Sequence, residues 1–443
     1  AYEKVVDRLL RSPRYGERMA ARWLDAARYA DTNGYQTDAE RVMWRWRDWV
    51  IDAFNRNLPF DQFTIEQIAG DMLPGATLSQ KIASGFNRNH RANSEGGIIP
   101  EEYLVEYVVD RVETTSTVWL GLTLGCARCH DHKYDPVTQK EFYQVYGYFN
   151  NIPERGRAFK FGNTPPLVPA PTPDQVARLA ELDRELAAGE KQFDEMRPAI
   201  ARAQREWEKS LAAAPRIEGQ LARDLALHHS GGELDGSRFV DAGDQANFGF
   251  LDAFTVSAWI HPSAPTGAIV TRTTDTPEGD GYGLWLTGGK VYLSLVQRWL
   301  DDALRVETRD PVSLNQWHHV LATYDGTRMA SGIRIFIDGV PAPLRVLLDD
   351  LNQNFAIKEP LRIGGGGGPE NRFRGSIADV RIYKVALPAE QAAVVATRAP
   401  LDELAAIVPE KRTPSQAAKL AGHFLDAAGP QPMREAWSRL LDV

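Results

Sequence analysis

The sequence predicts a multidomain chain that combines helical parts with one all-β part. Its 443 residues are enough for about three domains of the usual size. The hydrophobic share of 43% and the charged share of 25% are those of ordinary globular proteins. Hydrophobic residues recur with a helical period at both ends of the chain and alternate in between. We expect a helical domain over residues 1–160, a proline-rich linker with coiled-coil-like helices over 161–216, a β-sandwich over 217–396 and a helical segment over 397–443.

Charge and hydropathy exclude two classes of protein. The net charge is −8, with 51 basic and 59 acidic residues, whereas a general nucleic-acid binder needs a basic excess to neutralise phosphates. No apolar run reaches the roughly 18 residues that a transmembrane helix requires. We therefore expect no nucleic-acid partner and no membrane span.

The first 160 residues have the pattern of a helical domain. Trp44, Trp46 and Trp49 fall where a helix would direct an aromatic face into a core. Pro100, followed by two glutamates, is a typical helix start, and the glycines of 121–125 interrupt that helix. Helices are expected over residues 2–10, 22–30, 41–57, from 100 toward 120, and 138–148.

The segment 161–216 combines a proline-rich stretch with a stretch of helical periodicity. Residues 161–173 are rich in proline and predict an extended linker. From Asp174 to Ala214 apolar residues alternate by three and four, which is a coiled-coil stripe weakened at Gly189 and Pro198. Two antiparallel helices or one kinked helix would both fit this stripe.

Residues 217–396 alternate between apolar and polar side chains. Turn signals such as Asp325-Gly326 and Asp338-Gly339 separate the alternating runs. Many short strands at this spacing are typical of an all-β sandwich or jelly roll. The clearest strands are expected at residues 254–260, 283–286, 291–296, 319–324, 333–337 and 377–383.

The two cysteines of the chain lie three residues apart, as Cys126 and Cys129, and His130 follows directly. Cys-x-x-Cys-His is the attachment sequence of c-type haem. The two thiols add to the vinyl groups at one edge of the porphyrin, and the adjacent histidine is the proximal ligand of the iron. The motif therefore predicts a helical c-type haem domain with one covalent haem c, held by Cys126, Cys129 and His130.

Two other uses of the motif stay open from the sequence. His132 could complete a Cys2His2 zinc site, although all four ligands would then crowd into seven residues. The cysteines could also form a disulfide or stay a free dithiol, although no βαβ pattern surrounds them.

A distal ligand of the haem iron would have to come from elsewhere in the chain, since His132 is too close to His130 to reach the opposite face. His90 is the best candidate. Met43 and Met72 are weaker, because methionine more often fills a core. An open distal position would instead favour enzymatic chemistry.

Charged residues beside these candidates could take further roles. Arg88 and Arg91 flank His90 and could bind haem propionates or an anionic sugar, or lie in a solvated loop. Asp131, Lys133 and Asp135 follow the motif closely and are the catalytic candidates. A carboxylate near an axial histidine raises its basicity, which favours Asp131.

A row of carboxylates recurs at helical spacing after Pro100. Such a row could act as acid–base pairs or hold calcium, and more often it is a solvated helix face. Its members are Glu102, Glu106, Asp110 and Glu113.

Three aromatic residues of the β part are candidates for binding carbohydrate: Trp285, Tyr292 and Trp299. They could stack on sugar rings if they face a groove. Strand alternation would otherwise place some of them inside the sandwich.

Several stretches carry a resemblance to known families. Over residues 1–152, and above all in 121–136 around the motif, the chain resembles the large planctomycete- and verrucomicrobia-type cytochrome c-like proteins of unassigned function. Residues 217–396 resemble the concanavalin A-like, laminin G-type lectin and glucanase fold, by 254–260, 317–324 and 336–340. The resemblance implies a jelly-roll sandwich inserted into a protein of organisms that degrade complex polysaccharides.

Together these features predict an exported c-type haem protein of polysaccharide degradation, located in the periplasm or outside the cell. Its haem domain would perform or relay redox chemistry on carbohydrate, as a carbohydrate oxidoreductase would, and its sandwich would bind glycan or a partner. Electron transfer to a redox protein, with a sandwich used only for assembly, and a haem-free adhesion module are the alternatives. No signal peptide is visible, so we expect the sequence to be a middle section of a longer protein.

Overall fold

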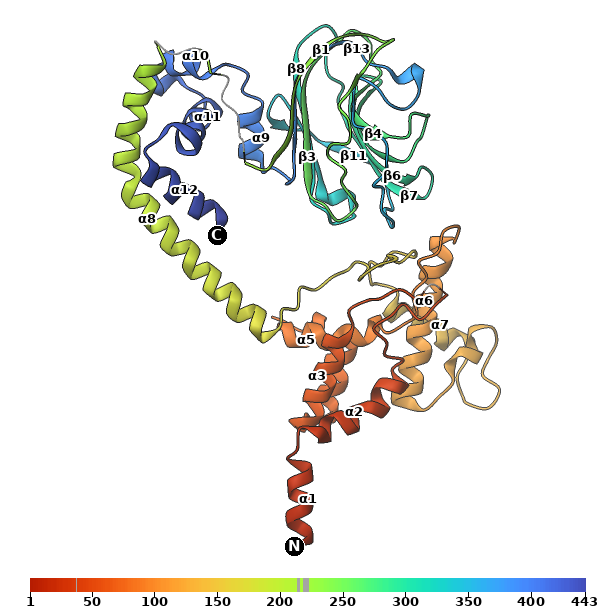
Figure 1. The fold of residues 1–443 in the computed structure, drawn as a ribbon. Coiled ribbons are helices and arrows are strands. Elements are labelled where there is room, and N and C mark those ends of the chain that lie inside the picture. The colour runs from red at the N-terminus through yellow and green to blue at the C-terminus, as the bar shows by residue number, and fades with distance from the viewer. Residues whose placement is uncertain (37, 213–215, 218–222) are drawn as a thin grey trace. The chain divides into compact units, whose positions relative to one another are not determined.

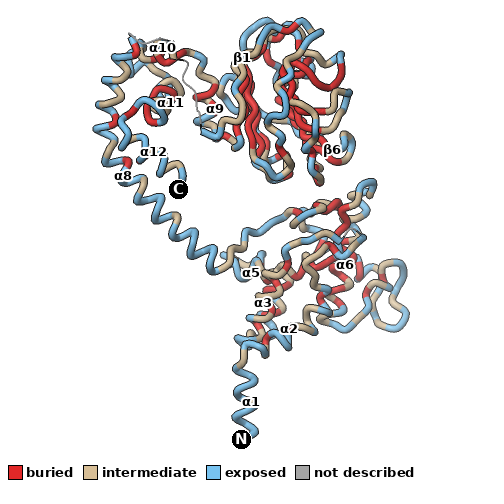
Figure 2. Tube along the Cα trace, in the orientation of Figure 1, coloured by how far each residue is buried: buried red, intermediate tan, exposed pale blue. Residues whose placement is uncertain are grey.

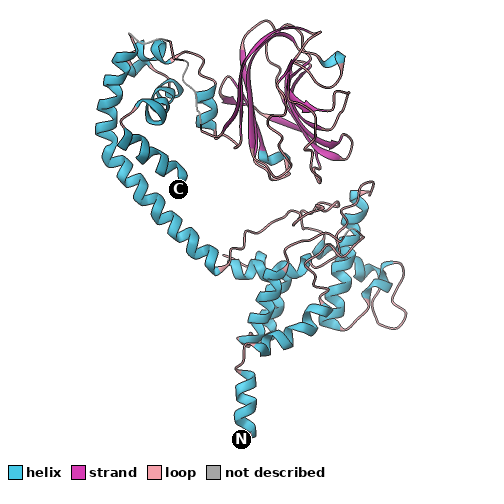
Figure 3. Cartoon of the chain, viewed as in Figure 1, coloured by secondary structure: helices cyan, strands magenta, loops and turns pink. Residues whose placement is uncertain are grey.

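The structure, a computed structural model, describes residues 1–36, 38–212, 216–217 and 223–443. The chain divides into two compact units, Ala1–Pro173 and Asp174–Val443. The first unit is built of helices and loops, and the sheets belong to the second (Figures 1 and 3). The expected combination of helical and all-β parts is therefore confirmed.

The helices of the first unit follow the apolar pattern. The helix expected at 2–10 is α1 (Tyr2–Leu10), and the tryptophan helix is α3 (Trp44–Asn55). The helix that starts at Pro100 is α6 (Pro100–Thr115), extended by a π-helical turn, η3 (Ser116–Leu120). The helix expected at 22–30 begins earlier, as α2 (Arg14–Ala26). The remaining elements are α4 (Phe60–Ala69), η1 (Gly70–Met72), α5 (Leu78–Ala83), η2 (Ser84–Arg88), η4 (Leu124–Arg128) and α7 (Gln139–Phe149).

A capping box starts the helix that follows the Cys-x-x-Cys-His motif. The Thr138 side chain accepts a hydrogen bond from the backbone of Glu141, and the Glu141 carboxylate accepts one from the backbone of Thr138. This reciprocal pair satisfies two donors that a helix start would otherwise leave free. The start of α7 is thereby set one residue after Thr138, which anchors one end of the motif loop.

An aromatic core holds the first unit together. Trp49 stacks on Phe63 with ring centroids 5.6 Å apart, and Phe86 meets Trp119 edge to face at 4.7 Å. Trp46 of α3 is almost completely buried in the same cluster, and Figure 2 shows the buried stretch along α3. Each large side chain removed from water stabilises the fold by ~1.5–3 kcal/mol. The expected aromatic face is therefore confirmed for Trp46 and Trp49, whereas Trp44 is not part of this cluster.

The proline-rich segment expected as a linker, residues 161–173, belongs to the first unit and is hydrogen-bonded to α3 and to the residues before it. Arg45 of α3 donates to the carbonyl oxygens of Ala170 and Pro171 at 3.0 and 2.9 Å. The side chain of Asn163 bonds to both the backbone N–H and the carbonyl of Val42. Prolines leave carbonyls that no neighbouring N–H of their own segment can satisfy, so side-chain donors take them.

The expected coiled-coil stripe forms one long helix, α8 (Pro173–Leu211), with Pro198 inside it. Phe193 and Ile200 pack in a cluster with Phe424 and Trp437 of the C-terminal helices. The stripe is therefore buried within its own unit along this half, instead of pairing with a second long helix. No described helix, α8 included, is long and apolar enough to cross a membrane. The other helices of this unit are α9 (Ala389–Val395), α10 (Leu401–Ala406), η7 (Pro409–Lys411), α11 (Pro414–His423), η8 (Phe424–Ala428) and α12 (Gln431–Asp442).

Two antiparallel sheets form the sandwich. The six-stranded sheet has the order β1-β13-β3-β8-β9-β10, and the seven-stranded sheet has the order β11-β7-β6-β5-β4-β12-β2. Strands distant in sequence are neighbours in both sheets, as in jelly rolls. The bounds are β1 (Leu225–Asp235), β2 (Val240–Asp241), β3 (Phe254–Pro262), β4 (Gly267–Thr273), β5 (Gly281–Thr287), β6 (Lys290–Arg298), β7 (Asp302–Thr308), β8 (His318–Tyr324), β9 (Ile333–Ile337), β10 (Val340–Pro341), β11 (Leu344–Asp349), β12 (Arg362–Ile363) and β13 (Arg374–Tyr383).

Every strand that the alternation singled out is present, as β3, β5, β6, β8, β9 and β13. The alternation did not single out β4, because all of its residues are buried and a strand covered on both faces has no polar side to alternate with. It also did not single out β1, which contains Gly231 and Gly232 and pairs with β13 from Leu225 to Asp235.

A buried histidine makes the stability of the sandwich depend on pH. His319 of β8 is 1% exposed, and burial lowers its pKa from 6.5 to about 4, because the charged imidazole loses its hydration. Between these two values the unfolded chain binds a proton that the folded chain does not. The free energy of unfolding should therefore fall as the pH falls from about 6.5 to about 4, by ~3 kcal/mol in all.

The variant His319→Asn should lose this part of the pH dependence. Urea unfolding at several pH values between neutrality and about pH 4.5 measures it, as the slope of the unfolding free energy against pH. The slope, and not the stability at one pH, is the diagnostic quantity, since the substitution also changes packing. Equal slopes for the variant and the wild type would contradict the expectation.

Candidate functional site

The Cys-x-x-Cys-His motif lies in the loop between α6 and α7. Arg128 inside the motif forms an ion pair with Glu106 of α6, with Nη2 and Oε1 2.5 Å apart. The carbonyl of Arg128 accepts hydrogen bonds from Gln139 and Tyr143 of α7, each at 3.1 Å. The loop is thus tied to both helices that flank it, while the cysteines on either side of Arg128 stay free and exposed.

The two histidines of the loop are used differently. His130 is exposed, and its Nδ1 lies 2.7 Å from the carbonyl oxygen of Asp131. The proton therefore sits on Nδ1, and Nε2 keeps the lone pair that a metal would take. The His132 side chain is buried, and its Nδ1 accepts the backbone N–H of Asp135 at 2.8 Å. His132 therefore serves the internal structure of the loop.

Of the alternative uses of the motif, the described residues form neither a zinc site nor a disulfide, and the two cysteines are free thiols. No group of three or more His, Cys, Asp or Glu side chains among the described residues could hold a metal ion, which excludes a preformed Cys2His2 zinc site. Cys126 and Cys129 are not joined in a disulfide.

The loop fits the covalent attachment of haem in its chemistry. Two exposed thiols are available to the porphyrin vinyl groups, and an imidazole whose other ring nitrogen donates to a backbone carbonyl is the usual form of a metal-binding histidine. An apolar hollow of about 770 Å³ is lined by Leu122 and Leu124 before the motif and by Val137 after it. The cysteines and His130 themselves are not part of that lining.

The three catalytic candidates after the motif have structural contacts. Asp131 accepts the backbone N–H of Gln139 at 2.8 Å and so holds the start of α7. Lys133 lies 5.2 Å from the ring centroid of Tyr134, and the Asp135 carboxylate is 3.3 Å from the His132 ring. A catalytic role for Asp131, Lys133 or Asp135 stays a prediction.

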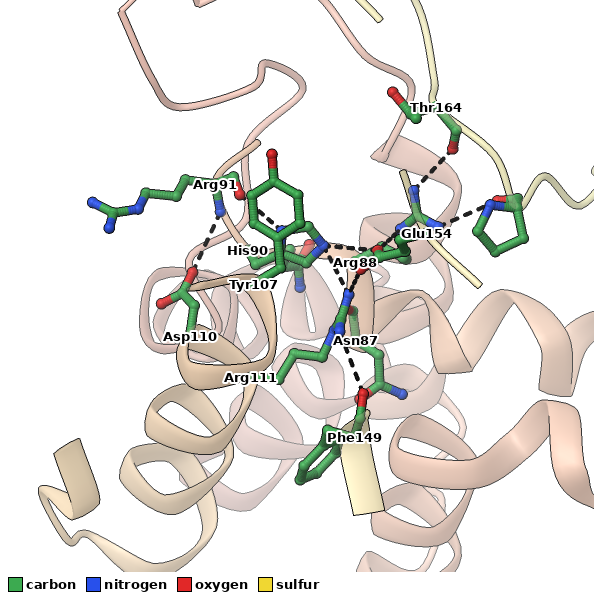
Figure 4. A network of polar contacts seen from close by, with 12 residues as sticks. Asn87, Arg88, His90, Arg91, Tyr107, Asp110, Arg111, Phe149, Glu154 and Thr164 are labelled. Atoms are coloured by element: carbon green, nitrogen blue, oxygen red, sulfur yellow. Dashed lines mark hydrogen bonds and ion pairs between the residues drawn. The ribbon is translucent and has the colours of Figure 1, made fainter. Parts of the chain in front are cut away.

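A buried polar network occupies the centre of the first unit (Figure 4). Its hub is Glu154, whose side chain is 4% exposed. Glu154 Oε1 accepts from Arg88 Nε at 2.9 Å and lies 3.0 Å from His90 Nε2, and its Oε2 pairs with Arg111 of α6. One carboxylate thus joins the end of η2, the chain that follows it and α6.

The charges of this network are set by burial and by the partners. Burial opposes ionisation of Glu154, but His90, Arg88 and Arg111 outweigh it and hold the pKa of the carboxyl well below its usual range. Burial lowers the pKa of His90, and the carboxylate of Glu154 opposes this shift. The network therefore holds one negative charge against two guanidinium groups.

Both ring nitrogens of His90, the expected distal ligand, are engaged in this network. Its Nδ1 lies 2.8 Å from the carbonyl of Arg91, and its Nε2 lies near Glu154 and 3.1 Å from Arg111 Nη2. Iron ligation through Nε2 would require these contacts to break. The distal role stays a prediction, as it does for Met43, which is buried, and for Met72, which is 71% exposed.

The two arginines beside His90 have separate partners. Arg88 is held by Glu154 and by the carbonyl of Thr164 at 2.9 Å. Arg91 is exposed and its guanidinium lies 5.7 Å from the ring centroid of Tyr35. A role of either arginine toward haem propionates or a sugar stays a prediction.

The carboxylate row of α6 is divided among arginine partners. Glu106 pairs with Arg128, and Asp110, which is buried, pairs with Arg28. Glu113 lies at 4.0 Å from the same Arg28. Most of this row is therefore neutralised by cations from other elements and is not a plain solvated face.

The three aromatic candidates of the sandwich gather on the seven-stranded sheet. Trp285 of β5 stands directly opposite Tyr292 of β6, and Tyr292 opposite Glu307 of β7. Their chain neighbours, such as Leu284 and Leu293, face the core, so these residues face the other side of the sheet. Trp285 is half-buried and Tyr292 is buried.

Charged residues complete this side of the sheet. Arg305 of β7 lies over the ring of Trp299 with its guanidinium carbon 4.2 Å from the centroid. Glu307 binds Lys290 at 2.9 Å and Arg345 of β11 at 2.6 Å. We name this surface the platform; it consists of Trp285, Tyr292, Trp299, Arg305, Glu307 and Arg345.

Sequence reasoning named Arg88 and His90 of the buried network but missed Glu154 and Arg111, and it missed the charged members of the platform. Glu154 and Arg111 have no motif around them, and only the fold brings them together. Arg305 and Glu307 alternate with core residues on β7, so the period of this strand could have placed them beside the aromatic candidates.

Comparisons with known families find one match within the first unit and another within the second. Residues 1–154 match a family described as a protein of unknown function (DUF1549). Residues 234–393 match the concanavalin A-like lectin/glucanases superfamily. The expected lectin-like sandwich is thus confirmed, while neither description contains the expected cytochrome c-like character. No curated protein matches the chain.

Solved structures resemble the sandwich. A carbohydrate-binding module (CBM40) of the Ruminococcus gnavus IT-sialidase, bound to α2,3-sialyllactose, is 15% identical with a TM-score of 0.31, over 38% of this chain and 98% of that one. A heptameric SAP-like pentraxin from Limulus polyphemus is 17% identical with a TM-score of 0.27, over 41% and 80%. A putative carbohydrate binding protein from Bacteroides ovatus is 18% identical with a TM-score of 0.25, over 40% and 47%.

The variant Glu154→Gln should destabilise the first unit strongly. It keeps the shape of the side chain but leaves Arg88 and Arg111 buried without their counter-charge, which costs ~3–5 kcal/mol. Glu106→Gln is the matched control, because its pair with Arg128 is partly exposed and should contribute about 1 kcal/mol or less. Chemical unfolding followed by circular dichroism measures both. Equal losses in the two variants would show that Glu154 is not the hub.

Proposed function

We propose that this protein binds carbohydrate through its β-sandwich and carries a covalent haem on its first unit, as an exported protein of polysaccharide degradation. The platform is the observation that carries the glycan-binding part. It combines aromatic rings with guanidinium and carboxylate groups on one side of a rigid sheet. The match of residues 234–393 to the lectin/glucanase superfamily supports this reading.

The chemistry of a sugar ring suits the residues of the platform. A pyranose offers C–H faces that pack on an aromatic ring, and hydroxyl groups that both donate and accept hydrogen bonds. Trp285 is partly accessible, and its indole N–H is held by Ser294 Oγ at 2.9 Å, so the ring has a fixed orientation. Arg345 of β11, which lies beyond β6 and β7 from Trp285, is 60% exposed and could reach a hydroxyl or an acidic group of a longer sugar chain. Preorganised rings and charges of this kind lower the entropic cost of binding.

The motif loop carries the haem part of the proposal. Cys126 and Cys129 would form the thioether bonds, and His130 Nε2 would bind the iron. The bound haem would supply a redox centre for electron transfer or for an oxidation. The chain's own contribution is orientation: Asp131 fixes the tautomer of His130 through its carbonyl, and Glu106 holds the loop through Arg128.

The proposed location follows from the proposed cofactor. Covalent haem attachment and glycan binding both belong outside the cytoplasm, so we place the protein in the periplasm or at the cell surface. A redox protein partner would be needed if the haem relays electrons.

Replacement of Trp285 tests glycan binding. Trp285→Ala should weaken binding of the full chain to its best ligand on a glycan array by about tenfold or more, equal to ~1.4 kcal/mol, because it removes the accessible ring of the platform. Trp317→Ala is the matched control: Trp317 is 37% exposed and directly precedes β8, a strand of the other sheet. Equal weakening by both variants, or binding that neither affects, would reject the platform.

An optical spectrum tests the haem. Protein matured in a host with cytochrome c assembly machinery should show a Soret band that survives denaturation and acid–acetone extraction. Cys126→Ala with Cys129→Ala should abolish the covalent band, and His130→Ala should change the spin state of the iron, since it removes the proximal nitrogen. His132→Ala, beside the motif but turned into the loop, is the control and should keep the band. A wild-type protein without a Soret band would reject the haem and leave the glycan part standing.

A further inference from the structure

A second pocket, in the first unit, collects cationic side chains. It has a volume of about 400 Å³ and lies between the start of α3, the end of α5 with η2, and residues 163–170. The described residues of its wall include Arg41, Arg45, Lys81 and Arg88, against one carboxylate, Asp71. In a chain of net charge −8, this local excess of positive charge favours an anionic ligand.

Arg41 is the wall residue that most needs a counter-ion. Its guanidinium donates to the backbone carbonyls of Arg88, His90 and Asn89 at 3.1, 3.0 and 3.3 Å, which are all neutral acceptors. Burial, and next the neighbouring charge of Arg88, lower the pKa of Arg41 to about 10. The charges of Asp31, Glu154 and Asp38 offset part of the cost of burying this cation, and an anion in the pocket would offset more of it.

Polar atoms of the wall are left without partners. Arg41 Nε and Trp46 Nε1 are buried donors, and Asn87 Oδ1 is a buried acceptor, with no hydrogen bond among the described residues. A ligand with both acceptor oxygens and hydroxyl groups would match this combination of donors and acceptor.

The start of α3 adds to the positive character of the pocket. α3 begins at Trp44, and the side chain of Met43 before it forms no cap; the backbone N–H of Met43 donates to Asp31 Oδ1 at 2.8 Å. Val42 to Trp46 all belong to the wall. The first N–H groups of a helix carry a partial positive charge and favour an oxyanion.

We infer that this pocket binds a sugar acid, that is, a single sugar ring that carries a carboxylate and free hydroxyl groups. The carboxylate meets the guanidinium groups of Arg41 and Arg45, the hydroxyl groups serve Asn87, and Trp44 and Met43 form the apolar part of the wall. The volume is that of an ordinary small-molecule site. The site lies in the first unit and is separate from the platform of the second.

Calorimetric titration of the full chain with D-glucuronate tests the inference. Binding should be one to one and should weaken as salt is added, because charge pairing carries it. D-Glucose, the same ring without the carboxylate, should bind at least about tenfold more weakly. Inorganic sulfate and phosphate are the third arm, and they should compete only weakly because they lack the ring.

Substitutions in the pocket wall test whether D-glucuronate binds in this pocket or elsewhere on the protein. Arg45→Gln and Lys81→Gln should each weaken D-glucuronate binding about tenfold, while Lys140→Gln, an exposed lysine on α7 outside the wall, should leave it unchanged. The inference is overturned if D-glucuronate does not bind, or binds equally well to the Arg45 and Lys81 variants. It is also overturned if glucose or sulfate binds as tightly as glucuronate. These results are independent of haem loading and of the Trp285 variant.

Discussion

The ionised carboxylate of Glu154 is the constraint on which the first unit depends. It lies in the chain after α7 and binds Arg88 at the end of η2, His90 and Arg111 of α6. The buried carboxylate is stable only because two guanidinium groups surround it, and they are stable only because of it. This mutual dependence fixes α6, which holds the motif loop through the ion pair of Glu106 with Arg128. It also fixes Arg88, which lines the cationic pocket.

Arginine side chains also hold segments that form neither helix nor strand, by donating hydrogen bonds to their backbone carbonyls. Arg45 and Arg88 donate to carbonyls of the proline-rich segment, and Arg41 donates to the carbonyls that precede and include His90. A planar guanidinium with five donors can satisfy several carbonyls that no strand or helix pairs. The two units thus offer different chemistry: a motif loop and a cationic pocket held by arginines in one, and a rigid aromatic and charged platform in the other.

Much of the fold could be predicted where one residue pattern maps onto one element. The six strands with clear alternation, the helix at Pro100 and the aromatic face of α3 are all present. The alternation did not single out β4, whose residues are all buried, and the stripe of α8 forms one helix that packs Phe193 and Ile200 against the C-terminal helices. Of the candidate sites, the motif loop and the aromatic members of the platform came from local sequence. Glu154, Arg41 and Glu307 did not, since their roles come from partners distant in the chain.

The sequence by itself determined the class of each part and the composition of the motif: helical ends, an all-β middle, and two thiols next to a histidine. Such features depend on periodicity and on neighbours within a few residues. Only the tertiary structure decided that His90 joins a buried carboxylate 64 residues away, and that Arg128 ties the motif to Glu106 of α6. The reason is that hydrogen bonding and burial, which set the charge and accessibility of a side chain, depend on residues brought together from far apart in the chain.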